Sequence, residues 1–144
     1  MLILGLVTLV LHGVLAGLYY AFSMSVMPGL KAVDDDAADA AMRSVNRKIL
    51  TPWLFVPFLG APVAAGAAGF LASGAAATWY FAAAAVNLVG SVLITAVVNV
   101  PLNNALLGGR IGFREYAPRW TAFNTLRAAL CVVSLLLVGV ALTR

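Results

Sequence analysis

Charged residues are scarce in this 144-residue chain, at 10% of the total against the roughly 25% that is usual in soluble domains. None lies between Met1 and Leu30, and none lies between Ile49 and Gly109. Hydrophobic residues make up 63% of the chain, and the mean hydropathy is +1.01. Each uncharged run exceeds the roughly 20 residues that cross a bilayer as a helix. A soluble enzyme, a nucleic-acid-binding protein and a disordered chain are therefore excluded, and the chain is predicted to be an integral membrane protein.

Metal-ligating side chains are equally few, since the chain has one cysteine, Cys131, and one histidine, His12. A single thiol forms no internal disulfide, and no second histidine or nearby carboxylate completes a metal site around His12. All five acidic residues lie outside the apolar segments. We therefore predict no metal site and expect no cofactor.

Four membrane-spanning helices can be drawn, which predicts an all-α four-helix bundle in one domain over the whole chain. Pro28 and Pro101 are predicted to follow the ends of the first and third helices, and Pro52 to open the second. Tyr116 and Trp120, near the start of the fourth, are typical of interfacial aromatics. The first segment is apolar from Leu2, so we expect a retained helix and not a cleaved leader. The predicted helices cover about residues 2–27, 52–72, 78–100 and 119–142.

The basic residues predict the orientation in the membrane. Eight of the nine lie in or beside the linkers that follow the first and third segments, and only Arg144 lies on the opposite side. Both long linkers are therefore expected in the cytoplasm and both termini outside, in a multi-pass protein of the inner membrane.

The first long linker is predicted to contain an amphipathic helix. Four aspartates gather at its start, and Arg43, Arg47 and Lys48 gather at its end, which complements the helix dipole. An apolar stripe through Met42 predicts a cytoplasmic helix lying on the membrane surface. Asn46 lies on the same side of this helix as Met42 and so faces the bundle or the bilayer. A polar amide on that side does not fit a helix that only lies on the membrane surface.

Polar side chains within the apolar segments form one stripe on each of three helices. Since a polar group in the bilayer needs a partner or a cavity, these stripes are predicted to face inward and to line a polar pocket in the cytoplasmic half of the bundle. The stripes comprise His12, Tyr19 and Ser23, then Asn87, Ser91, Thr95 and Asn99, then Asn124, Arg127, Cys131 and Ser134.

Arg127 and His12 each admit two roles. A buried arginine stays charged and needs an anion, yet no carboxylate lies at the depth of Arg127. It either reaches the interface or caps backbone carbonyls near Pro101, or it binds an anionic ligand or reaction intermediate. His12 is either a proton shuttle or a hydrogen-bonding partner of Asn87.

Four strings of residues resemble the anthrone oxygenase family over about residues 13–138. In chain order they are Tyr20–Leu30 (YAFSMSVMPGL), Met42-x-x-Val45-Asn46, Asn99-Val100-Pro101-Leu102-Asn103 and Trp120-x-x-x-Asn124-x-x-Arg127.

The resemblance implies a four-helix membrane protein that oxidises an anthrone with molecular oxygen, without metal or flavin. Removing a proton from such a flat aromatic leaves an electron-rich anion that reduces oxygen itself. The chain then supplies a base, an anion-binding site and a dry pocket. The candidate catalytic residues are Tyr19, Tyr20 and Arg127, together with His12, which is included for its chemistry and its place in the inward stripe and not for the resemblance. The candidate substrate-binding residues are Ser23, Asn46, Asn99, Asn103 and Asn124.

Two further interpretations stay open. The same pocket suits a non-catalytic binder or carrier of a small aromatic, quinone-like or lipidic anion. Alternatively, the protein is an interaction subunit in which the polar stripes only hold the helices together. The expected partners are a small hydrophobic aromatic molecule and the lipid bilayer, with a homo-oligomer also open.

Overall fold

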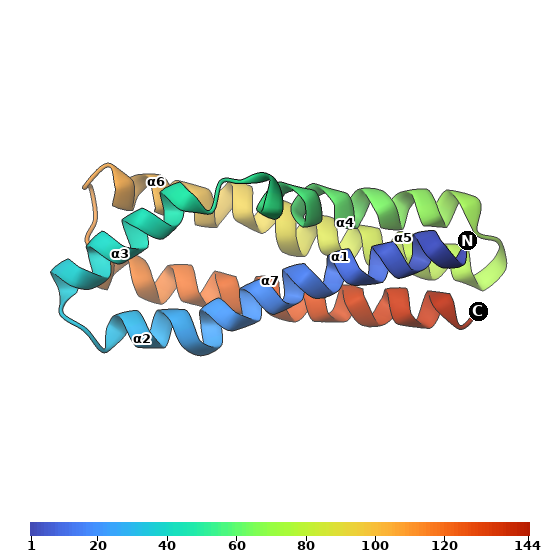
Figure 1. Cartoon of the computed structure of the whole chain (residues 1–144), viewed down its shortest axis with the longest axis horizontal. Coiled ribbons are helices and arrows are strands. Elements are labelled where there is room, and N and C mark those ends of the chain that lie inside the picture. Colours follow the sequence, from blue (N-terminus) through green and yellow to red (C-terminus); the bar gives the residue numbers. More distant parts are fainter.

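The computed structural model describes all 144 residues, and every regular element in it is a helix (Figure 1). Four helical stretches are long and apolar enough to cross a membrane. They form an elongated bundle with both termini at the same end. The predicted all-α architecture is confirmed, and these are the helices of a multi-pass membrane protein. The four stretches are Leu2–Lys31, Pro52–Leu71, Gly74–Leu107 and Phe113–Leu142.

The first and third stretches continue through proline, so the predicted ends before Pro28 and Pro101 are wrong. A π-helical turn precedes each proline, and there the amides of Met27 and Val100 bond to carbonyls five residues back. Proline has no backbone N–H to donate, and the wider turn before it allows the helix to continue without that hydrogen bond. The first stretch is α1 (Leu2–Ala21), a π turn (Phe22–Val26) and α2 (Met27–Lys31). The third is α5 (Gly74–Asn87), two π-helical segments (Leu88–Leu93 and Thr95–Asn99) and α6 (Val100–Leu107).

The second and fourth stretches differ in how well their bounds were predicted. α4 (Pro52–Leu71) agrees to within one residue, whereas α7 (Phe113–Leu142) begins six residues before the predicted start at 119. The first turns of α7 are held by packing, because Phe113, Tyr116 and Trp120 are buried in one apolar cluster. Tyr116 and Trp120 are therefore core residues and not interfacial aromatics.

A linker helix, α3 (Asp35–Lys48), completes the bundle at the end away from the termini (Figure 1). The stretches through α1, α5 and α7 have 30 to 34 residues, about 45–50 Å, whereas α4 has 20, about 30 Å. α3 packs against α2, α6 and α7, in the position that α4 is too short to reach. Ala38, Met42 and Asn46 form its buried face. The predicted helix exists, and its Met42–Asn46 face contacts protein.

Small residues allow the helices to approach closely in the apolar half. A Cβ added at Gly90 would lie 2.4 Å from the Cβ of Leu130 on α7, which is closer than two carbons can stand. Glycine is therefore required where the third and fourth stretches meet.

Candidate functional site

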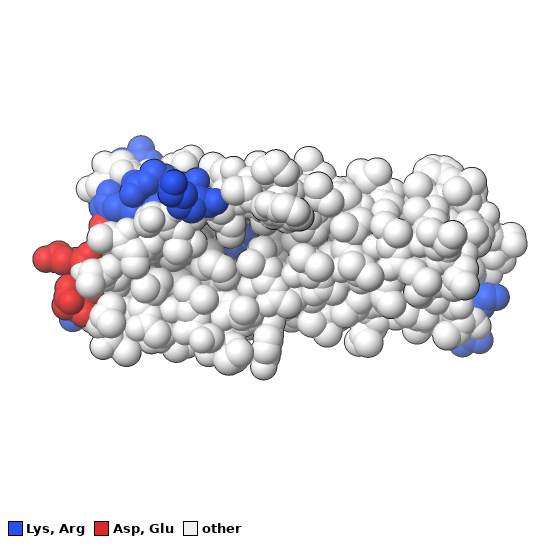
Figure 2. Space-filling model, viewed as in Figure 1, with Lys and Arg blue, Asp and Glu red and all other residues white.

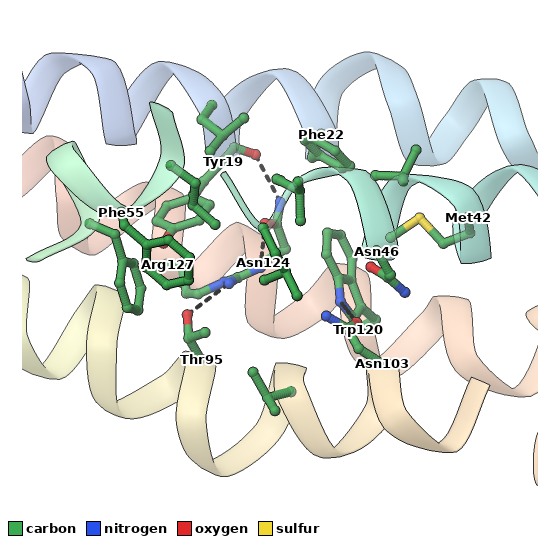
Figure 3. A pocket seen from close by; sticks show the side chains of 17 residues that line it. Tyr19, Phe22, Met42, Asn46, Phe55, Thr95, Asn103, Trp120, Asn124 and Arg127 are labelled. Carbon is green, nitrogen blue, oxygen red and sulfur yellow. Dashed lines mark hydrogen bonds between the residues drawn. The ribbon is translucent and has the colours of Figure 1, made fainter. Parts of the chain in front are cut away.

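A cavity of about 280 Å³ lies where α1, α7 and the segment Thr95–Asn103 face the junction between α3 and α4 (Figure 3). A space of this size can hold a small ligand. Twelve of its 17 lining residues are hydrophobic. The polar lining residues are Asn46, Thr95, Asn103, Asn124 and Arg127.

Arg127 points into the bundle and is 5% exposed. Its Nη1 donates to Thr95 Oγ1 and its Nη2 donates to Asn124 Oδ1, each at 2.8 Å. Its Nε has no hydrogen-bond partner. The two ion pairs of the protein join Arg43 to Asp39 and Arg114 to Asp35, so the Arg127 charge has no carboxylate against it.

Two aromatic rings hold the same guanidinium. Its carbon lies 4.4 Å from the centre of the Tyr19 ring and 5.4 Å from that of Trp120. The negative face of an aromatic ring attracts a cation but does not neutralise it. Of the five N–H donors of Arg127, two are used within the protein, which leaves donors for a bound anion.

The amide of Asn124 links helix α1 to Arg127 (Figure 3). Its Nδ2 donates to the carbonyl oxygen of Tyr19 at 2.8 Å and to Ser23 Oγ at 2.6 Å. With its amide hydrogens directed at α1 and at the π turn that follows it, its Oδ1 is turned toward Arg127. The hydrogen bonds therefore fix the orientation of the amide that positions the cation.

Asn99 and Asn103, on either side of Pro101, both hydrogen-bond to Trp120. Asn103 Oδ1 accepts hydrogen bonds from the Tyr116 hydroxyl and from Trp120 Nε1, both at 2.8 Å. Asn99 is buried behind the cavity and donates to the carbonyl oxygen of Trp120 at 3.3 Å. Both amides stabilise the wall formed by Trp120.

Asn46 lies at the α3 side of the cavity (Figure 3). The residue is 5% exposed, and its Nδ2 has no hydrogen-bond partner. A buried donor without a partner is destabilising by about 1–3 kcal/mol, so such groups in binding sites are often satisfied by the ligand.

The sequence model of the family described as anthrone oxygenase matches residues 42–137, two thirds of the chain. The chain belongs to the anthrone oxygenase family. No curated protein and no solved structure matches the chain. The matched region of this family member contains all five polar residues of the cavity, whereas Leu18, Tyr19 and Phe22 are contributed by the preceding helix.

Six of the predicted site residues of this anthrone oxygenase family member are brought together. Tyr19, Asn46, Asn103, Asn124 and Arg127 line the cavity, and Ser23 is hydrogen-bonded to one of them. The Tyr19 hydroxyl is 2.8 Å from Ser91 Oγ. Backbone carbonyls near Pro101 were one predicted set of partners for Arg127, and its observed partners are the side chains of Thr95 and Asn124 instead.

Two predicted catalytic residues lie outside the cavity. Tyr20 is 58% exposed on the outer face of α1, because successive residues of a helix point about 100° apart and Tyr19 faces inward. His12 is fully buried about two turns from Tyr19, and its Nδ1 donates to the carbonyl oxygen of Thr8 at 2.8 Å. The His12–Asn87 hydrogen bond, one of the two roles considered for His12, is absent, because His12 Nε2 and Asn87 Oδ1 both lack a partner.

Sequence reasoning missed Thr95 and the aromatic wall. The sequence analysis placed Thr95 in an inward stripe but not among the site residues. Its four-residue spacing from Ser91 and Asn99 was the signal that could have included it. Phe55 and Phe58 on α4 line the cavity, and nothing in their sequence context distinguishes them from other apolar residues of that helix.

Proposed function

We propose that this protein oxidises a small flat phenolic aromatic of the anthrone type with molecular oxygen. The observation that carries the proposal is the buried Arg127, which has unused donors and no carboxylate partner in an apolar cavity. A buried cation of this kind stabilises a ligand that becomes anionic much more than it stabilises a neutral one. Family membership supports the same substrate class.

The proposed reaction converts a ring methylene into a carbonyl. Loss of one methylene proton gives an anion whose negative charge lies largely on the ring oxygen. The anion reduces oxygen by one electron, and the resulting radical and superoxide combine, with a proton, into a hydroperoxide at that carbon. Removal of the remaining proton from the carbon then breaks the O–O bond and releases water. One anthrone and one oxygen molecule give one anthraquinone and one water.

Arg127 accounts for the acceleration of the first step. The cavity is lined by no carboxylate and no imidazole, so a strong general base is not among its walls. A guanidinium against the ring oxygen stabilises the anion and lowers the barrier to losing the proton. Tyr19, hydrogen-bonded to Ser91, is the titratable hydroxyl nearest to Arg127 and the candidate for moving that proton.

The proposal includes a place for the protein in the cell. Eight of its nine basic residues lie at the end of the bundle that holds α3 or in the adjoining half of α7. This bias favours an inner-membrane protein with that end in the cytoplasm and both termini outside. The cavity then lies in the cytoplasmic half, where it meets aromatic molecules made inside the cell.

Oxygen uptake tests the proposal directly. Purified protein in detergent is mixed with emodinanthrone in an oxygen electrode, and its rate is compared with spontaneous oxidation and with the variants Arg127→Ala and Arg119→Ala. We expect acceleration by the unaltered protein and by Arg119→Ala, whose side chain is exposed on the same helix, and background rates with Arg127→Ala. Saturable binding of emodin without faster oxygen uptake would contradict the enzymatic role and favour the binder or carrier.

A further inference from the structure

The outer wall of the cavity is a junction between two helices and not a packed helix. α3 ends at Lys48, and Thr51, just before α4, is extended with φ −130° and ψ 162°. α3 packs against α2, α6 and α7, whereas α4 packs against α1 and α5. Lining residues lie on both sides of this break, among them Asn46, Ile49, Leu50 and Phe55.

The end of the bundle beyond α3 is closed. Met27, Met42, Leu106 and Tyr116 are completely buried there in one cluster with Trp120. A ligand arriving along the bundle axis from that end would have to separate these side chains. At the opposite end of the cavity, Leu15, Ala61 and Cys131 are equally buried and close the bundle toward the termini.

The outer side of the junction is apolar next to the start of α4 and basic next to the end of α3. Leu50 lines the cavity and is still 64% exposed, and Phe55 is 44% exposed. Arg47 and Lys48, in the last turn of α3, are exposed immediately before Leu50. Figure 2 shows basic surface over α3 beside a hollow in the molecule.

The junction lies at the level of a membrane interface. With 20 residues, α4 is about 30 Å long, which equals the thickness of the hydrocarbon core. Its first turn therefore lies at the edge of that core, where the 89% exposed Trp53 suits the headgroup region. The junction thus opens sideways, where amphipathic aromatic molecules collect.

We propose that the segment from Asn46 to Phe55 is a lateral entrance for a flat phenolic aromatic that is already dissolved in the membrane. The rings pass between Leu50 and Phe55, and Arg47 and Lys48 attract an ionisable phenolic oxygen at the interface before the ligand reaches Arg127. This inference rests on the proposed function for the class of ligand. It adds a route into the site and a function for exposed residues that the reaction does not use.

Binding kinetics of emodin to the protein in phosphatidylcholine vesicles test the entrance. Stopped-flow absorbance and dye fluorescence give the association and release rates, with Arg127→Ala as the background. We expect Thr51→Trp, which enlarges a side chain of the junction that does not line the cavity, to slow both rates about fivefold or more and to change Kd by less than about twofold, because an obstruction in the path leaves the bound state unchanged. Leu71→Trp, at a 67% exposed position at the other end of α4, is the matched control and should change neither rate.

Charge reversal provides a second, independent measurement. Arg47→Glu with Lys48→Glu should lower the association rate about tenfold and leave release unchanged, because steering acts before binding. The control, Arg110→Glu with Arg119→Glu, makes the same change of net charge away from the cavity. Unaltered rates in both entrance variants would overturn the entrance while leaving the proposed function intact. Absence of emodin binding to the unaltered protein would overturn the proposed function and this inference together.

Discussion

The guanidinium of Arg127 lies 4.4 Å from the centre of the Tyr19 ring, so the cation from α7 rests against a ring from α1. Asn124 joins the same two helices, since it accepts from Arg127 and donates to the Tyr19 carbonyl oxygen. Together these contacts hold the guanidinium against α1 in one orientation.

Arg127→Lys tests whether geometry or charge alone is required. Lysine keeps the positive charge but cannot span Thr95 and Asn124 while lying against the ring of Tyr19. We expect oxidation of emodinanthrone to fall about 100-fold in the oxygen electrode, as when one transition-state donor is removed. The control Arg119→Lys should match the unaltered protein, and equal rates in both variants would show that a diffuse charge suffices.

Tyr19→Phe and Tyr20→Phe make the same change at adjacent positions. Loss of the Tyr19 hydroxyl removes its contact with Ser91 and should slow oxidation about 100-fold if that hydroxyl moves the proton. Tyr20 is on the outer face of α1, so its variant should retain full activity. Similar losses in the two variants would contradict this assignment.

Asn46→Leu removes a buried donor that has no partner in the protein. We expect emodin binding to weaken about tenfold, measured by titration, because the ligand loses one hydrogen bond. The thermal unfolding midpoint in detergent should stay the same or rise, since no internal hydrogen bond of Nδ2 is lost. Asn104→Leu, at an exposed position of α6, is the matched control. A large fall in the midpoint of Asn46→Leu alone would indicate a structural role.

Gly90→Ala should destabilise the bundle by about 1–3 kcal/mol, because the new methyl group overlaps the Cβ of Leu130. Gly17→Ala is the control, since a Cβ there meets nothing within 4 Å. Reversible unfolding in mixed micelles, followed by circular dichroism, measures both. Equal stability of the two variants would contradict the close helix contact at Gly90.

Single-cysteine labelling measures the orientation. In a Cys131→Ala background, Ala37→Cys at the start of α3 should react with a membrane-impermeant maleimide only after the cytoplasmic side is made accessible. Ala76→Cys, near the start of α5, should react from outside in intact cells. The reverse pattern would show that the cavity opens into the outer half of the membrane.

Much of the architecture could be predicted from local chemistry alone. Long uncharged runs require spanning helices, and polar groups in hydrocarbon require partners, so the stripes through Asn87, Asn124 and Arg127 had to face inward. All three residues are buried as predicted. These conclusions depend on each residue and its solvent, which the sequence specifies directly.

The tertiary structure decided what depends on residues far apart in the chain. Which hydroxyl faces the cavity, Tyr19 or Tyr20, is set by the rotation of α1 against α7. α3 contacts protein because α2, α6 and α7 extend past the start of α4, and the helices continue through Pro28 and Pro101 by way of π turns. Arg127 selects Thr95 and Asn124 because packing brings those oxygens within 2.8 Å. Such distances follow from how the helices pack together, and no local pattern in the sequence records them.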